Sequence, residues 1–187
     1  MAWIPLVVLA SLVLLIIGMY NTLVRLKVQS ENAWADVDVQ LKRRHDLIPN
    51  LVETVKGYAG HEKQTLEAVI TARNRAMSAT TPATKAEAEG VLAQSLKSLF
   101  ALAEAYPQLR AVESFTQLQG SLSQIEEAVQ NARRYYNAVV RDLNTKIQEF
   151  PSNFIATFFS FKTREFFEIA DVAERVLPKV SFEQASR

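Results

Sequence analysis

The stretch FTQLQGSLSQIEEAVQNARRYYNAVVRDL, residues 115–143, decides the fold of this chain. Apolar residues return along it at alternating steps of three and four, which is the spacing of one face of an α-helix. A stripe of this length is typical of a rod that packs lengthwise against other helical rods. It predicts a helix over 108–149 whose buried face comprises Phe115, Leu118, Leu122, Ile125, Val129, Ala132, Tyr136, Val139 and Leu143.

Apolar residues with the same spacing predict further helices on both sides of this rod. One runs through residues 23–58, with a kink expected at Pro49, which lacks a backbone donor and crowds the carbonyl of residue 45. Others are expected over 66–77, from Thr81-Pro82 to Tyr106, and, as a last short helix, over 163–176. No segment alternates with period two over a useful length. The chain is therefore predicted to be all-α.

The N-terminal residues have the composition of a membrane segment. Residues 1–24 carry no charged side chain, and residues 4–20 are almost wholly apolar. About 20 such residues in a helix span the ~30 Å hydrocarbon core of a bilayer. A buried core helix and a cleavable signal peptide are alternatives, but the basic leading region and small-residue cleavage site of a signal peptide are missing. We predict an uncleaved transmembrane anchor over residues 1–24, with Trp3, Tyr20 and Arg25 as membrane-interface anchors.

The basic residues near this segment all follow it. Arg25, Lys27 and the run at residues 42–44 come after the segment, and no Lys or Arg precedes it. The positive-inside rule therefore predicts that the N-terminus lies outside and that residues 25–187, the helical-bundle domain, are cytoplasmic.

The composition excludes several classes of function. The chain has 21 Lys+Arg and 20 Asp+Glu, for a net charge of +1, which does not support nucleic-acid binding. It has no cysteine, so disulfides, iron–sulfur clusters and thiol catalysis are excluded. His45 and His61 lack the spacing of a helical zinc site, and we interpret both as surface or supporting residues. We predict no catalytic residue, no metal and no cofactor.

One charged residue breaks the apolar stripe of the helix over residues 23–58. Most of the polar residues at 36–46 form an ordinary solvated face, but Arg44 falls on the stripe, where an unpaired charge would be unfavourable. Its partner should be a carboxylate on a facing helix. Glu126, which flanks the stripe of the 108–149 helix, is the predicted partner.

Phenylalanine is concentrated at the C-terminal end, where eight of the ten occur after residue 149. These rings could cap the end of the bundle, or they could form a surface for self-association or for the membrane interface. We predict the second role, because adjacent residues in the pairs at 158–159 and 166–167 cannot both face one core. The predicted oligomer or lipid interface comprises Phe154, Phe158, Phe159, Phe161, Phe166 and Phe167.

Several blocks resemble the bacterial LemA family. The blocks at residues 20–24, 32–52 and 55–58 carry the resemblance, which continues through Tyr106-Pro107, 133–137, 150–153 and 180–182. The resemblance implies a single-pass protein of the bacterial cytoplasmic (inner) membrane with an elongated up-and-down four-helix bundle. It implies no established enzymatic activity. A relative associated with magnetosome membranes suggests a membrane-organising role by analogy.

These observations favour a non-catalytic structural or interaction protein. An anchored rod with heptad stripes is suited to assembling with copies of itself or to organising other membrane proteins, with lipid as a further partner. The alternative is an accessory or adaptor subunit of a membrane enzyme or protease system. An enzyme would need a convergent polar pocket, which the linear sequence does not display.

Overall fold

The computed structural model describes residues 3–168, and their regular structure is entirely helical. No strand occurs within this range. The predicted all-α class is therefore confirmed. The helices are α1 (Ile4–Ala59), α2 (Lys63–Ser78), α3 (Pro82–Glu104), α4 (Pro107–Arg110), α5 (Glu113–Gln148) and α6 (Ser152–Phe158).

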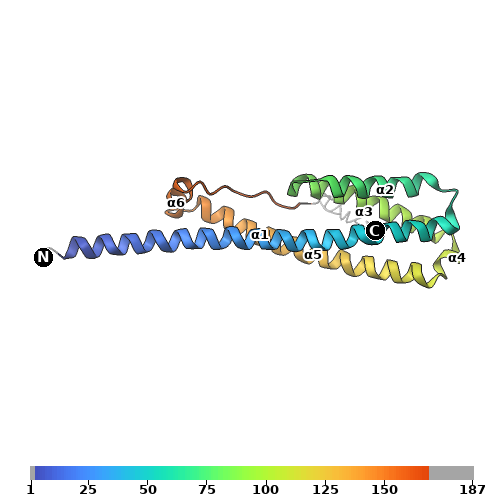
Figure 1. Ribbon diagram of the computed structural model, residues 1–187, viewed down its shortest axis with the longest axis horizontal. Coiled ribbons are helices and arrows are strands. Elements are labelled where there is room, and N and C mark those ends of the chain that lie inside the picture. Colours follow the sequence, from blue (N-terminus) through green and yellow to red (C-terminus); the bar gives the residue numbers. More distant parts are fainter. Residues whose placement is uncertain (1–2, 169–187) are drawn as a thin grey trace, which may run out of the picture.

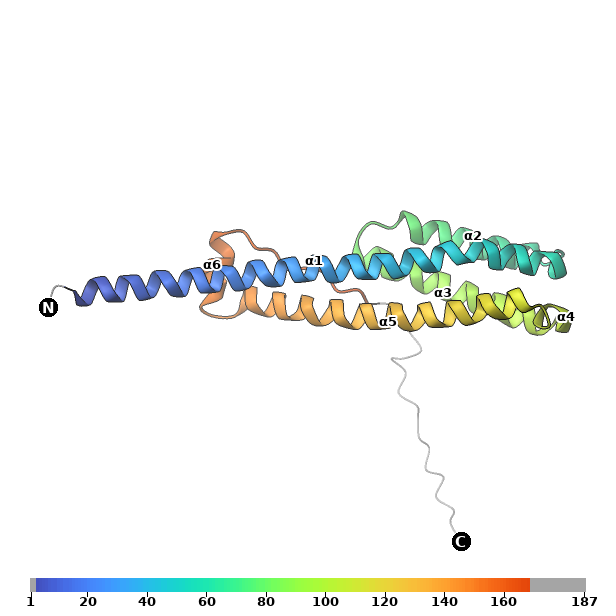
Figure 2. The same cartoon turned by 60° about the horizontal axis from the view of Figure 1, so that its bottom comes forward.

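The helices form an elongated up-and-down bundle (Figures 1 and 2). The long helices α1 and α5 lie side by side, antiparallel, over most of their length. The α2–α3 hairpin packs beside them at the end farther from the N-terminus, so four helices lie together there. At the other end α6 and the chain that follows it take the place of the hairpin. The N-terminal part of α1 projects beyond all of them.

Helix α1 is a single element of 56 residues, about 84 Å long. It passes residues 24 and 25, where the anchor was predicted to end, without a break. It also continues through Pro49 and ends at Ala59, before Gly60. Its first turns are exposed, and Leu23 is its first buried residue. In the described part of the chain, α1 is the one helix long and apolar enough to cross a membrane.

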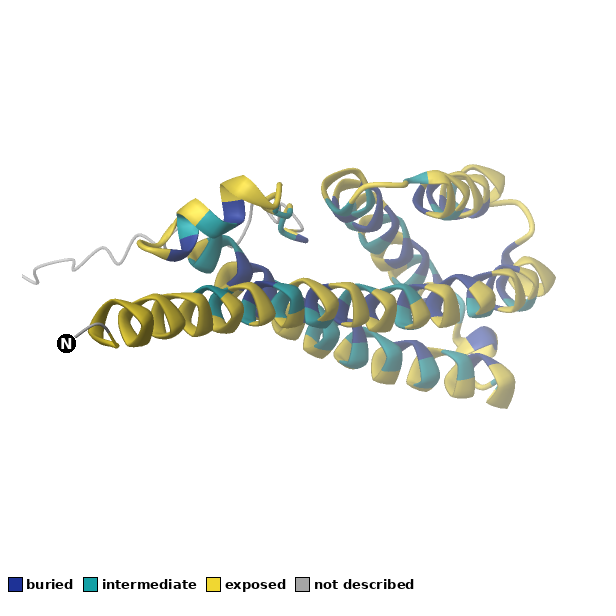
Figure 3. Ribbon diagram, turned by 60° about the vertical axis from the view of Figure 1, so that its left-hand side comes forward, coloured by how far each residue is buried: buried dark blue, intermediate teal, exposed yellow. Residues whose placement is uncertain are grey.

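The buried residues follow the predicted stripes and face the inside of the bundle (Figure 3). They form two clusters along it. The distal cluster, inside the four-helix end, contains Ile48, Leu51 and Val55 of α1 together with side chains of α2, α3 and α4. The proximal cluster lies between α1 and α5. Its buried members are Ala33, Val37, Leu41, Ala86, Val129, Tyr136, Val140 and Phe167.

The predicted helix over 108–149 is two helices in the structure. The short α4 ends at Arg110, and Val112 adopts an extended backbone (φ −77°, ψ 117°) before α5 begins. The Val112 N–H donates to the Leu109 carbonyl at 3.0 Å, which closes the turn between them. This break lets Leu109 enter the distal core while α5 runs back along α1.

The predicted helix over 163–176 is wrong for residues 163–168, which are not helical; its remainder lies outside the described residues. Two asparagines of α5 bind this segment. The Asn144 side chain exchanges two hydrogen bonds with the backbone of Arg164 (2.8 and 2.9 Å), and Asn137 does the same with Phe167 (2.9 and 3.1 Å). Seven residues of helix rise about 10.5 Å, and three residues of extended chain cover about 10 Å. The distance between the two asparagines along α5 therefore equals the distance between Arg164 and Phe167 only if the segment is extended.

Candidate functional site

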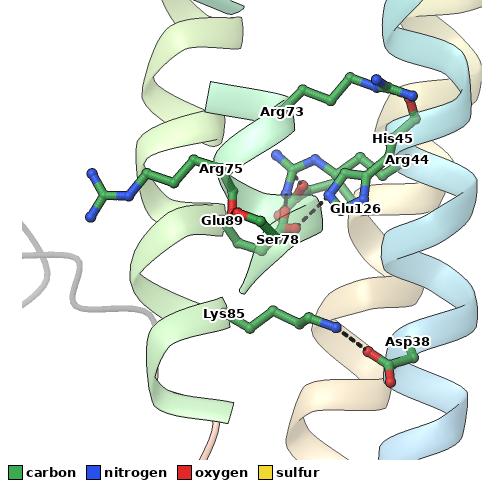
Figure 4. A network of polar contacts seen from close by, with 9 residues as sticks. All are labelled: Asp38, Arg44, His45, Arg73, Arg75, Ser78, Lys85, Glu89 and Glu126. Carbon is green, nitrogen blue, oxygen red and sulfur yellow. Dashed lines mark hydrogen bonds and ion pairs between the residues drawn. The ribbon is translucent and has the colours of Figure 1, made fainter. Parts of the chain in front are cut away.

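A buried polar cluster joins α1 to α3 (Figure 4). Arg44 and His45 are 4% and 6% exposed, and Glu89 is fully buried. Arg44 Nη1 donates to Glu89 Oε2 at 3.2 Å, and His45 Nε2 lies 2.6 Å from Glu89 Oε1. Because a carboxylate only accepts, Nε2 is the protonated nitrogen of the imidazole in this contact. One carboxylate thus ties two neighbouring residues of α1 to α3.

Glu126 of α5 forms the outer part of this cluster. Arg44 Nη2 lies 3.1 Å from Glu126 Oε2, so the structure brings together the two residues that the sequence predicted to pair. The Glu126 side chain is 41% exposed, whereas that of Glu89 is fully buried. Arg44 therefore bridges three helices, and Glu89, which sequence reasoning missed, is its buried partner.

At the same level, Pro49 leaves one backbone acceptor of α1 without a helical donor. Proline has no N–H, so the carbonyl of residue 45, four positions earlier, loses its helical donor. Arg73 of α2 replaces it: Arg73 Nε donates to the His45 carbonyl oxygen at 2.8 Å. The proline and the arginine thus act together to hold α2 against α1.

A second polar contact lies closer to the start of α3. Lys85 Nζ lies 2.6 Å from Asp38 Oδ1 and 5.6 Å from the centre of the Trp34 ring. The ammonium group is therefore held by an ion pair and a cation–π contact together. It fixes the start of α3 on α1.

These contacts are suited to stability rather than to turnover. The oxygens of Glu89 are both engaged by α1, and the group has no exposed surface. His61 lies exposed in the turn between α1 and α2, remote in sequence from the cluster. In the range 3–168, no group of three or more His, Cys, Asp or Glu side chains is placed to hold a metal ion.

Of the two roles predicted for His45, surface or supporting residue, the first is wrong, because the ring is buried against Glu89. A signal for Glu89 was present in the sequence. It occupies a stripe of α3 at spacings of three and four with Ala86, Leu92 and Leu96, all of which are buried. A carboxylate at such a position needs a buried partner, as Arg44 does.

Burial raises the pKa of one further group, the hydroxyl of Tyr136 on α5. The nearby Arg164 opposes this shift in pKa, and Glu165 adds to it. The hydroxyl donates to the Glu165 carbonyl oxygen at 2.8 Å, and the ring packs on Trp34 at 5.1 Å between centroids. Tyr136 thus anchors the segment after α6 within the proximal core.

An exposed aromatic patch lies where α1 leaves the bundle. Phe150, Phe154 and Phe158 are 75%, 66% and 81% exposed. Phe159 is 47% exposed, and its ring packs on Tyr20 of α1 at 4.7 Å between centroids. We call these four phenylalanines the foot patch. Because of the Tyr20 contact, the foot patch lies beside the end of the apolar span.

The other phenylalanines predicted for this interface lie elsewhere. Phe167 is fully buried, with its ring 5.7 Å from Trp34, so its predicted interface role is wrong. The hydrogen bonds from Asn137 turn its side chain into the core. Phe166 is half-buried against the same core, and Phe161 is half-buried with its ring 5.9 Å from Tyr20.

The predicted membrane anchors lie at the two ends of the apolar span. Trp3 is 69% exposed and precedes the first turn of α1. Tyr20 touches the foot patch, and Arg25 follows one and a half turns later as an exposed residue.

Comparison with known proteins identifies the family. The family model described as the LemA family matches residues 33–182. The chain is 24% identical over 175 residues to magnetosome protein MamQ 2 of Paramagnetospirillum magneticum, a match that covers 80% of this chain and 64% of that protein. It is 24% identical over 161 residues to protein LemA of Metamycoplasma hominis, covering 86% and 73%. The chain thus spans less than two thirds of the length of the magnetosome protein. With a matching family model over most of its residues, the chain belongs to the LemA family.

Proposed function

We propose that this chain is a non-catalytic membrane protein that holds a rigid helical bundle against the bilayer and there assembles with copies of itself or organises other membrane proteins. The observation that carries the proposal is the continuity of α1. The first turns of α1 are apolar and exposed, and its last turns are packed in the bundle. No flexible linker separates these two parts of α1. The depth and tilt of the apolar span in the bilayer therefore set how far the bundle lies from the bilayer and in which direction it points.

The foot patch supports contact with lipid or with a second copy. Large exposed aromatic side chains are unfavourable in water and mark interaction surfaces. Their position beside Tyr20, at the end of the apolar span, supports contact with the membrane interface, which aromatic rings favour. Copies confined to one membrane also meet at high effective concentration. The magnetosome relative, by its name, belongs to a membrane organelle, which agrees with a membrane-organising role.

The orientation and compartment remain as the flanking charges predict: an N-terminus outside and a bundle in the cytoplasm, at the bacterial inner membrane. Protease added to intact spheroplasts should then leave the bundle whole. Digestion of the bundle in spheroplasts that are still sealed would reverse the orientation.

Assembly is tested by measuring the mass of the full chain in mild detergent and in bilayer discs. We expect more than one copy in each particle. Phe154→Ser with Phe158→Ser should lower the number of copies or the affinity for membrane, whereas Ile70→Ser with Met77→Ser, also exposed apolar residues but on α2, should change neither. A single copy in both environments would refute self-assembly.

A groove between α3 and α5 favours the alternative of an accessory subunit. It has a volume of about 670 Å³ and an apolar floor that includes Leu96, Phe100 and Leu122, with Arg44 at one wall. Such a surface suits a helix from another protein. Under this alternative, the chain would be a single copy in detergent and would gain mass only when purified with its partner from native membranes.

A further inference from the structure

A second pocket, of about 580 Å³, lies beside α1 where the apolar span ends. Its walls are α1, the end of α5 and the chain just after α6. We propose that it binds the phosphate headgroup of an anionic phospholipid whose acyl chains lie along the apolar span. The inference rests on the proposed insertion of α1 into a membrane and holds for either orientation of the bundle.

The pocket carries unpaired positive charge. Three basic residues line it, Lys27, Lys162 and Arg164, against one acidic residue, Glu31. Arg164 Nη2 lies 2.7 Å from Glu31 Oε1, so these two charges are matched. In the part of the chain that the structure describes, neither lysine has a carboxylate within 4.0 Å. An anionic phosphate would supply the missing partner for both lysines.

The apolar and basic walls are arranged in the order of a lipid molecule. Tyr20, Val24 and Phe159 line the end near the span, and Lys27 follows one to two turns further along α1. Tyr20 and Lys27 are separated by about 10 Å of helix rise. The headgroup region adds roughly 5–7 Å on each side of the hydrocarbon core, and a lysine stem can extend back along apolar surface to reach it. A free phosphate ion would make no use of the apolar end.

The far wall of the pocket is fixed before any ligand arrives. Helix α6 ends in a Schellman turn: the Phe161 N–H donates to the Ala156 carbonyl at 2.9 Å, and the Ser160 N–H donates to the Thr157 carbonyl at 3.2 Å. Ser160 takes the left-handed conformation (φ 57°) that this turn requires. The rings of Phe159 and Phe161 then pack on Tyr20. Lys162, the next residue, then lines the pocket on the wall formed by the chain after α6, and Lys27 lines it on the wall formed by α1.

The test measures lipid retained by the full chain in a neutral detergent. The protein is offered equal amounts of phosphatidylglycerol and phosphatidylcholine with the same acyl chains, and bound lipid is counted by native mass spectrometry. We expect a preference for phosphatidylglycerol. Lys27→Gln and Lys162→Gln should each weaken its binding about fivefold, and the two together about thirtyfold, without changing retention of phosphatidylcholine.

Two sets of variants make the result specific. Lys63→Gln with Lys97→Gln removes the same charge from exposed sites on α2 and α3 and should leave the preference intact. Lys27→Arg with Lys162→Arg keeps the positive charge and should also keep the preference for phosphatidylglycerol. Circular dichroism of each variant should match the wild type, because both pocket lysines are exposed.

Several results would overturn the inference. The first is equal retention of the two lipids by the wild type. The second is an equal loss of phosphatidylglycerol binding in the Lys27→Gln/Lys162→Gln and Lys63→Gln/Lys97→Gln variants. The third is displacement of bound phosphatidylglycerol by inorganic phosphate as readily as by phosphatidylglycerol itself. The last result would indicate a site for free phosphate. Loss of the lipid preference in a chain that resists alkaline extraction from membranes would refute this inference alone. A chain released by alkaline extraction would refute the proposed anchoring as well.

Discussion

The His45 carbonyl oxygen allows a direct test of how α2 is held on α1. Replacing Arg73 with Met keeps an apolar stem but removes the Nε donor that lies 2.8 Å from this oxygen. With Pro49 in place, no helical N–H can substitute, so a partly buried carbonyl is left without a partner. We expect the free energy of unfolding to fall by about 1–2 kcal/mol.

The same substitution should be nearly harmless once Pro49 is replaced. Pro49→Ala supplies an N–H four residues after His45, which can donate to the same carbonyl. In that background Arg73→Met should lower the free energy of unfolding by well under ~1 kcal/mol, which gives a coupling of about 1 kcal/mol or more in a double-mutant cycle.

The assay is urea unfolding of the full chain in one mild detergent, followed by circular dichroism of the helices. Arg75→Met serves as the matched control on the same helix, because its contact with Glu87 is largely exposed and should contribute less than ~1 kcal/mol in either background. Equal effects of Arg73→Met with and without Pro49 would refute the reasoning.

Three further substitutions test separate parts of the structure. Arg44→Asp puts a second carboxylate beside the buried Glu89, and Glu89→Ala removes the buried carboxylate that both Arg44 and His45 contact. Each should lower the free energy of unfolding by about 3–5 kcal/mol, and wild-type unfolding of both would contradict the buried pair. Burial raises the pKa of Tyr136 above its usual 10.0, so the neutral hydroxyl is favoured in the folded state; stability should be level below about pH 10 and fall above it, less steeply in Tyr136→Phe, as followed by unfolding at each pH. Ser160→Gly should raise the unfolding free energy by about 1 kcal/mol by relieving the left-handed backbone, and a lowered value in the same urea assay would show that the serine is not strained.

Local periodicity predicted the long helices, because it depends only on neighbouring residues, but it missed α6 and the break between α4 and α5. The stripe of α5 and the apolar span of α1 required no knowledge of tertiary contacts. The position of Arg44 on a stripe also indicated a buried charge from sequence alone. Choosing between Glu126 and Glu89 as its main partner required knowing that α3 covers this part of α1, and periodicity does not carry that information.

The segment after α6 shows where this reasoning fails. Residues 163–168 have an aromatic, helix-compatible sequence, yet asparagine side chains of α5 bind their backbone and extend it. This tertiary contact decides that Phe167 is buried. Phe154 and Phe158, which belong to the short α6 and have no such contact, are exposed as the sequence suggested.

The central claim is that one rigid helix carries the bundle and holds it against the bilayer. The most direct test measures how deep labelled residues lie in the bilayer. The chain has no cysteine, so Leu12→Cys, Phe158→Cys and His61→Cys each provide a unique site for a nitroxide label in bilayers. Collision with oxygen and with a water-soluble nickel complex reports how deep each label lies. We predict the label at residue 12 in the hydrocarbon, at 158 near the headgroups and at 61 in water. A label at 158 as accessible to nickel as that at 61, or a label at 12 in water, would contradict the account.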